Sequence, residues 1–140
     1  MLIFAWGTII AAISLMSLFI FWMVYPYKAT EFTNVPYPVQ NKEVESGGYV
    51  FYNVHYCKYS DTIPQVSKSF IDGVLYTIPP AVGAVVEKGC HEFLVQTYVP
   101  KALVPGTYII QINYKFRMNP LKTIEVTTET EPFTVVNGGL

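Results

Sequence analysis

An uncharged, apolar run occupies the start of the chain. Residues 1–27 contain no Asp, Glu, Lys, Arg or His. A helix from about Leu2 to Val24 would rise roughly 35 Å, enough to cross the hydrocarbon core of a bilayer with some tilt. Trp6 lies near one end of this helix and Trp22 near the other, where amphipathic rings anchor at membrane interfaces. We therefore expect residues 1–27 to be a transmembrane anchor.

A cleaved signal peptide is the alternative interpretation of this segment. Signal peptides carry a basic n-region, a shorter apolar core and a small-x-small cleavage site. Here no basic side chain precedes the apolar run, and the bulky residues of VYPYKATEF follow it. The absence of a polar face also argues against a buried helix of a soluble protein. The pattern favours an uncleaved anchor.

Small residues form a stripe along the expected anchor. Gly7, Ala11 and Ser14 have a helical spacing that can seat a neighbouring transmembrane helix. The same stripe is compatible with lipid contact alone, so both interpretations stay open.

The rest of the chain has the composition of one small β domain. About 110 residues follow the anchor, enough for a single domain. The 11 Tyr and 9 Phe residues, with only 14% charged residues, favour strands over helices. The net charge is -1, and Arg117 is the single arginine, so the basic footprint of nucleic-acid binding is missing. We expect no nucleic-acid partner and no cofactor.

Composition divides this part into a linker and a domain. Residues 28–47 are polar, and Pro36 and Pro38 stiffen them toward extended geometry, so we expect an extended linker with a weak strand possible at Tyr37–Asn41. The domain is expected at 48–137.

Alternation and turn signals predict about seven short strands in that domain. The clearest strand is 107–118, in which Tyr108, Ile110, Ile112, Tyr114 and Phe116 face one way and polar residues mostly face the other. Asp72-Gly73 indicates a type I′ hairpin between two β-prone runs, which Pro79-Pro80 should end. Further strands are expected at 49–57, 90–99, 123–128 and 133–136. Such spacing is typical of an antiparallel β-sandwich rather than a βαβ fold.

The two cysteines bear on topology. Cys57 and Cys90 form an even pair in a membrane-tethered β domain, which indicates one disulfide made outside the reducing cytosol. Two reduced, buried thiols in a cytoplasmic domain are the alternative. Lys28, just after the apolar run, favours a cytoplasmic C-terminal domain by the positive-inside rule. We give the cysteine pair more weight and expect the N-terminus inside and the domain outside, in a periplasmic, extracellular or virion-membrane setting.

The stretch Leu103-Val104-Pro105-Gly106-Thr107-Tyr108, followed by an alternating strand, resembles the tyrosine corner of immunoglobulin-like sandwiches. The resemblance implies that 49–57 is strand B, 90–99 strand E, 107–118 strand F and 123–136 strand G, with the Asp72-Gly73 hairpin supplying C and C′ or D. The Cys57–Cys90 bridge would then join the end of B to the start of E. Antibody domains differ, because they bridge B to F beside a Trp, whereas Ile112 is in strand F here and no Trp follows Trp22.

The spacing CKY…F-DG-Y…GCH…PGTY…NPL…EPF also resembles that of small anchor-plus-sandwich membrane proteins of bacteriophages and marine bacteria. This resemblance implies no known activity.

Metal binding is a further possibility to weigh. His55, Cys57, Cys90 and His91 carry ligand types suited to zinc or copper. Consecutive strand residues such as Cys90 and His91 point to opposite faces, however, which hinders a four-ligand site. A disulfide flanked by two surface histidines is the simpler interpretation. Because no nucleophile elbow, HExxH motif or phosphate loop occurs either, we expect no enzyme activity.

The chain contains more tyrosines than a core of this size can bury. We therefore expect some of them to form an exposed contact surface for a protein or glycan, although they could simply cover strand faces near the membrane. The candidates are Tyr52, Tyr56, Tyr59, Tyr76 and Tyr98.

These features lead to three functional hypotheses. The first is a non-enzymatic, membrane-anchored immunoglobulin-like module that presents a binding or assembly surface to protein partners outside the cytosol. The second is a structural subunit of a virion or membrane complex. The third is a metal-binding periplasmic domain.

Overall fold

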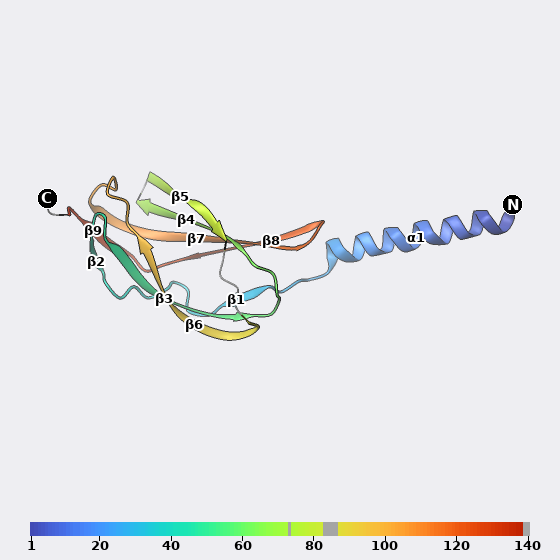
Figure 1. Cartoon of the computed structure of the whole chain (residues 1–140), viewed down its shortest axis with the longest axis horizontal. Helices are drawn as coiled ribbons and strands as arrows, with labels where there is room; N and C mark the ends of the chain where they lie inside the picture. The colour runs from blue at the N-terminus through green and yellow to red at the C-terminus, as the bar shows by residue number, and fades with distance from the viewer. Residues whose placement is uncertain (73, 83–86, 139–140) are drawn as a thin grey trace.

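A single N-terminal helix precedes a β-sandwich in the computed structural model, which describes residues 1–72, 74–82 and 87–138 (Figure 1). Helix α1 spans Leu2–Val24 and has no buried residue. It is long and apolar enough to cross a membrane, with a mean hydropathy of 2.2. The predicted helix is therefore present, and its bounds agree with the uncharged run.

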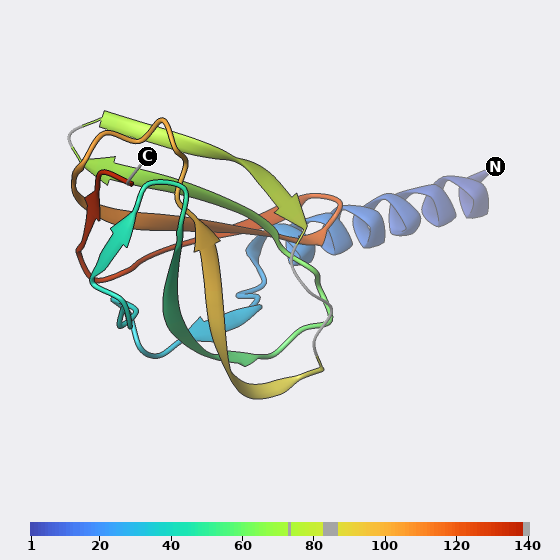
Figure 2. The same cartoon turned by 60° about the vertical axis from the view of Figure 1, so that its left-hand side comes forward.

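The sandwich consists of two facing sheets, seen as separate layers in Figure 2. The smaller sheet has the order β1-β3-β6, where β1 is Thr30–Phe32, β3 is Tyr49–Lys58 and β6 is Gly89–Tyr98. The larger sheet has the order β2-β9-β7-β4-β5, and β8 also pairs with β7. Its strands are β2 (Glu43–Glu45), β4 (Gln65–Asp72), β5 (Val74–Val82), β7 (Gly106–Asn119), β8 (Lys122–Glu129) and β9 (Phe133–Val136). The all-β, immunoglobulin-like sandwich is confirmed, with strands B and E as antiparallel neighbours.

Strand β7 organises the larger sheet. Its first residues pair with β9, its remainder pairs with β8, and its other edge pairs with β4. The predicted inward face is confirmed, because Tyr108, Ile110, Ile112 and Phe116 are buried. Tyr108, Ile110 and Ile112 belong to the same core cluster as Val50, Tyr52 and Val54 of β3.

Residues 28–47 belong to the domain and are not the extended linker that their composition predicted. They contribute β1 and β2 to the two sheets. The expected strand at Tyr37–Asn41 is replaced by two isolated bridges, from Tyr37 to Thr130 and from Val39 to Tyr52. Tyr37 and Val39, on either side of Pro38, both point inward and are buried in the core, and their burial holds this segment on the sandwich. The connection between α1 and β1 is therefore only residues 25–29.

The predicted hairpin is present as β4 and β5, which pair antiparallel from Gln65–Val82 to Asp72–Val74. Its expected turn residue, Gly73, lies outside the described residues. Strand β5 continues through Pro79-Pro80 instead of ending there as the sequence predicted. Because β5 is at the edge of its sheet, proline nitrogens without a hydrogen are tolerated in it.

The β7–β8 turn contacts the end of the helix. Asn119 Nδ2 donates to the Trp22 carbonyl at 3.1 Å, and Lys122 Nζ donates to the Met23 carbonyl at 3.0 Å and to the Tyr25 carbonyl at 3.3 Å. Carbonyls in the last helical turn have no partner within the helix, so these donors satisfy them. This turn consequently marks the anchor end of the sandwich (Figure 1).

Candidate functional site

A cavity of about 750 Å³ lies between the two sheets. Most of its lining is aromatic or aliphatic and comes from β1, β3, β4, β6 and β7: Phe32, Tyr52, Val54, Tyr56, Val66, Phe93, Val95, Tyr114 and Phe116. The remaining lining residues are Thr30, Pro64, Lys68, Glu87 and His91. A concave, largely apolar site with few polar groups is the usual form of a small-molecule site, and its volume is within the usual range.

The pairing register of the strands shows which end of the cavity is the inner end and which is the mouth. Three cross-strand pairs of β3 and β6 line it in succession, with Tyr52–Val95 innermost, then Val54–Phe93, and then Tyr56–His91. The last pair adjoins the end of β3, which pairs with the start of β1 just after the anchor. Among the lining residues, Phe93 is 43% exposed and Glu87 is also exposed. The mouth therefore lies near the start of β6, at the anchor end of the domain.

A polar cluster lies at the inner end. Lys68 Nζ, from β4, donates to Thr97 Oγ1 on β6 at 2.9 Å, so this side chain bridges the two sheets. Tyr52 Oη lies 3.1 Å from the same Thr97 oxygen. The Lys68 ammonium is also 5.8 Å from the centroid of the Tyr52 ring. This cluster places a cation and the hydroxyl and ring of Tyr52 at the inner end of a largely apolar cavity. Thr97, which both groups contact, is not itself in the lining.

Burial changes the acid–base behaviour of this cluster. Desolvation lowers the pKa of the Lys68 ammonium below its ordinary value. Desolvation also raises the pKa of the Tyr52 hydroxyl, despite its hydrogen bond with Thr97. Tyr114, in the cavity wall, has its pKa raised chiefly by burial as well. The tyrosines therefore stay neutral, and Lys68 is the group at the inner end that can carry charge.

The expected tyrosine surface is only partly present. Tyr52 is fully buried, so its prediction as an exposed contact residue is wrong. Tyr52 lies on the inward face of β3, in alternation with Val50 and Val54. The outward face of the strand is also rich in aromatic residues, so the sequence did not show which face is buried. Tyr56 is half-buried and lines the cavity.

Two of the other candidate tyrosines are exposed but far apart in the smaller sheet. Tyr98 stacks edge-on with Tyr49 at one end of the β3–β6 pair, and Tyr59 follows β3 at the other end. The side chain of Tyr76 lies outside the described residues. The described tyrosines thus do not form one exposed patch.

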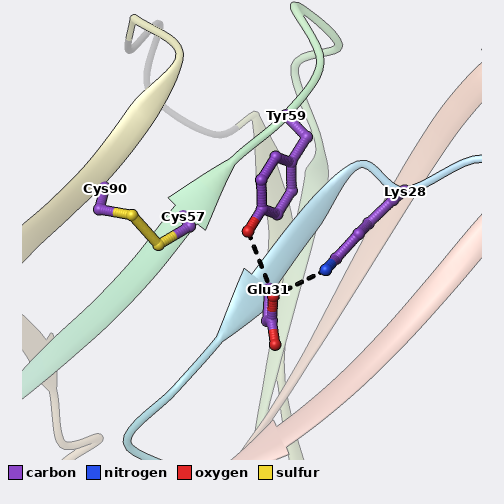
Figure 3. Close-up of polar contacts among 5 residues, drawn as sticks. All are labelled: Lys28, Glu31, Cys57, Tyr59 and Cys90. Atoms are coloured by element: carbon purple, nitrogen blue, oxygen red, sulfur yellow. Dashed lines mark hydrogen bonds and ion pairs between the residues drawn. A yellow bond between two sulfur atoms is a disulfide. The ribbon is translucent and has the colours of Figure 1, made fainter.

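Cys57 and Cys90 face each other across β3 and β6 and are joined by a disulfide (Figure 3). Both sulfurs are then unavailable as metal ligands. The two histidines make separate contacts, His55 with the Thr33 hydroxyl and His91 Nε2 with the Glu87 carbonyl at 2.8 Å. In the described part of the chain, no group of three or more His, Cys, Asp or Glu residues could hold a metal ion.

The first residues after the anchor form an exposed ion pair beside the disulfide. Lys28 Nζ is 2.8 Å from Glu31 Oε2, and the Tyr59 hydroxyl donates to the same carboxylate at 3.2 Å (Figure 3). The hydrogen bond with Glu31 raises the pKa of Lys28, and the same bond lowers the pKa of Glu31. Exposed pairs of this kind contribute little to stability.

Two other predicted positions are visible in the structure. The Tyr108 hydroxyl donates to the Val104 carbonyl, the contact expected of a tyrosine corner. Along α1, a Cβ added at Gly7 would meet no atom within 4 Å, and the Ser14 hydroxyl bonds back to the Ile10 carbonyl. No other part of the described chain covers the small-residue stripe.

Sequence analysis missed the cavity and its lysine. One signal was present, because Lys68 shares an inward-facing register on β4 with Val66 and Phe70. A lysine between two apolar neighbours of the same face is out of place in a core. The size of the space between the sheets had no corresponding local signal.

Comparison with known proteins gives distant similarities of structure. No protein-family model and no curated protein matches the sequence. A Niemann-Pick type C2 protein from the Japanese carpenter ant is similar, with a TM-score of 0.44 and 13% identity over 80% of this chain and 96% of that one. The CARDB domain of a Pyrococcus furiosus protein, in complex with di-metal ions, has a TM-score of 0.35 and 16% identity over 77% and 97%. Identities this low do not carry function from either protein to this chain.

Proposed function

We propose that this chain is a non-enzymatic, membrane-anchored binding module whose site is the cavity between the two sheets, held outside the cytosol. The observation that carries this proposal is the cavity of about 750 Å³ with a largely apolar lining and a lysine at its inner end. A sandwich selected for stability alone would fill such a space, because unfilled apolar volume is destabilising.

Two further observations support the setting. Helix α1 has the length and hydropathy of a membrane span, and a disulfide such as Cys57–Cys90 is formed and kept in oxidising compartments. The absence of catalytic chemistry is part of the proposal: among the described residues, no hydrogen bond joins a serine hydroxyl to a histidine. Mass measurement of unreduced protein from its native membrane tests the compartment, and two free thiols would place the domain in the cytosol.

Adjacent residues of β6 provide a matched test of the site. Val95 points into the cavity, whereas Leu94 is exposed on the opposite face. In full-length protein reconstituted into lipid nanodiscs, Val95→Trp should obstruct the cavity beside Tyr52 and strongly reduce uptake of an uncharged, environment-sensitive apolar dye. Leu94→Trp adds the same side chain outside and should leave uptake at the wild-type level. Equal uptake by both variants would contradict the cavity as the site.

A structural subunit of a membrane complex or virion is the second candidate. The outer face of the β3–β6 pair favours it, because Tyr49, Leu94 and Tyr98 are exposed there. Within the described residues, the outer edge of β6 has no strand partner. Exposed apolar side chains beside an open edge are a common contact site for another chain. Native mass measurement after mild detergent extraction separates the candidates, since a monomer without co-purifying protein contradicts an assembly role.

A further inference from the structure

The cavity differs from an ordinary apolar core because it has a half-buried cation, Lys68, at its inner end. Lys68 lies on the central strand β4, between Ile112 of β7 and Ile78 of β5 in the pairing register. Its single hydrogen bond among those found is to Thr97 Oγ1, and an ammonium group has three donors. Donors therefore remain at the inner end of the cavity for another acceptor.

No counter-charge accompanies this lysine. The ion pairs of the described residues join Lys28, Lys42, Lys88 and Lys115 to carboxylates, and none includes Lys68. The positions outside the described residues carry neither Asp nor Glu. Partial removal of a cation from water without a paired anion is unfavourable, and this is consistent with the pKa of Lys68, which desolvation lowers.

We propose that the cavity binds a single-chain amphiphile with an anionic head group, the head at Lys68 and the tail along the apolar walls toward the mouth. This inference rests on the proposed function and names the ligand class of the same site. A carboxylate at the inner end would accept hydrogen bonds from Lys68 and from the Tyr52–Thr97 hydroxyl pair. It would supply the charge that the folded protein lacks there.

The other features of the cavity fit the same orientation. Val54, Val66, Phe93 and Tyr114 surround the middle of the cavity and provide the apolar contact for a tail. Glu87, at the mouth, would repel an anionic head placed there. The volume suits one drug-sized molecule, and therefore one acyl chain rather than the two chains of a phospholipid.

The position of the mouth indicates where such a ligand comes from. The start of β6 and the start of β1 both pair with the last residue of β3, and β1 directly follows the anchor. The mouth is therefore close to the bilayer surface, where single-chain amphiphiles dissolve. A ligand can pass between bilayer and cavity over a short path.

The test compares one tail with three head groups. Full-length protein in phosphatidylcholine nanodiscs is incubated with labelled hexadecanoate, and retention is measured above that of empty nanodiscs. Unlabelled hexadecanoate, hexadecan-1-ol and hexadecyltrimethylammonium then compete. We expect hexadecanoate to compete best and the cationic amphiphile worst. Lys68→Met should weaken hexadecanoate binding about tenfold or more, because it removes a charge-assisted hydrogen bond. Lys68→Arg should restore most of the binding, and Lys115→Met, at an exposed lysine outside the cavity, should change nothing.

The outcomes separate the two proposals. Equal competition by hexadecanoate and hexadecan-1-ol, together with unchanged binding by Lys68→Met, overturns the anionic head group while the cavity remains a binding site. No retention of labelled hexadecanoate above that of empty nanodiscs, together with no effect of Val95→Trp on dye uptake, overturns both. The fold of Lys68→Met is checked by comparing its circular dichroism spectrum with that of the wild type. Thr97→Val, which removes the hydroxyl that bridges Lys68 and Tyr52, is the second variant of the same polar cluster.

Discussion

The disulfide gives the most quantitative prediction for this domain. Cys57 and Cys90 are 33 residues apart in sequence and directly opposite in the β3–β6 register. In the chain-entropy model, a cross-link closing a loop of this length lowers the entropy of the unfolded chain enough to stabilise the fold by about 4 kcal/mol. Replacing both cysteines with alanine should therefore lower the free energy of unfolding by about that amount, a large share of the total for a small domain.

The measurement is chemical unfolding of the full chain in detergent micelles, followed by near-UV circular dichroism of its tyrosines. Wild-type protein with a reductant is the matched comparison, because it also lacks the cross-link but keeps both side chains. Cys90 is exposed, so the reductant can reach the bond. Reduced wild type and the double variant should lose the same stability. A loss below about 1 kcal/mol in both would refute the entropic argument and show that the unfolded chain already holds these segments together.

Three further predictions concern single side chains. Tyr108→Phe removes the hydrogen bond to the Val104 carbonyl and should cost about 1 kcal/mol in chemical unfolding; no loss would exclude a stabilising tyrosine corner. Burial raises the pKa of Tyr37 to about 12, so its neutral form stabilises the fold below pH 10, and this stability should be lost as the pH rises toward 12. Tyr37→Phe should reduce that decline by about 1.4 kcal/mol per pH unit, and an unchanged slope would contradict the assignment. Asn119→Ala removes the bonds to the Trp22 carbonyl and the Tyr27 hydroxyl, and amide hydrogen exchange at the end of α1 should quicken while exchange in β3 stays the same.

Features that depend on local periodicity were predictable from the sequence. The uncharged run predicted α1, and the alternation of residues 107–118 predicted both the bounds and the buried face of β7. In each case the pattern repeats over many residues, so one irregular position such as Ile109 does not hide it. The antiparallel pairing of β3 and β6 then followed from the immunoglobulin-like order of strands.

Features that depend on distant contacts were not predictable in the same way. Tyr37 is part of the core because it meets Thr130 and Tyr52, both far away in sequence. Its own neighbourhood of prolines and polar residues indicates a linker instead. Three-residue strands such as β1 and β2 are likewise too short to show a period.

The candidate site is the extreme case of this difficulty. Each wall of the cavity has an ordinary strand pattern, and the space exists only because the two sheets leave it unfilled. Lys68 is a residue whose type conflicts with the inward face that it shares with Val66 and Phe70. A single conflict cannot show whether a lysine reaches solvent, pairs with an acid or, as here, bonds across the sheets to Thr97.

The short connection between α1 and β1 limits how far the domain can travel. Residues 25–29 can span at most roughly 17 Å when fully extended. With α1 in a bilayer, the domain is confined to a thin layer above the head groups. For the amphiphile proposed above, an encounter with the domain then becomes a search in two dimensions, governed by the number of ligand molecules per unit of membrane area. Two membranes with the same total ligand but different surface areas would load this protein to different extents.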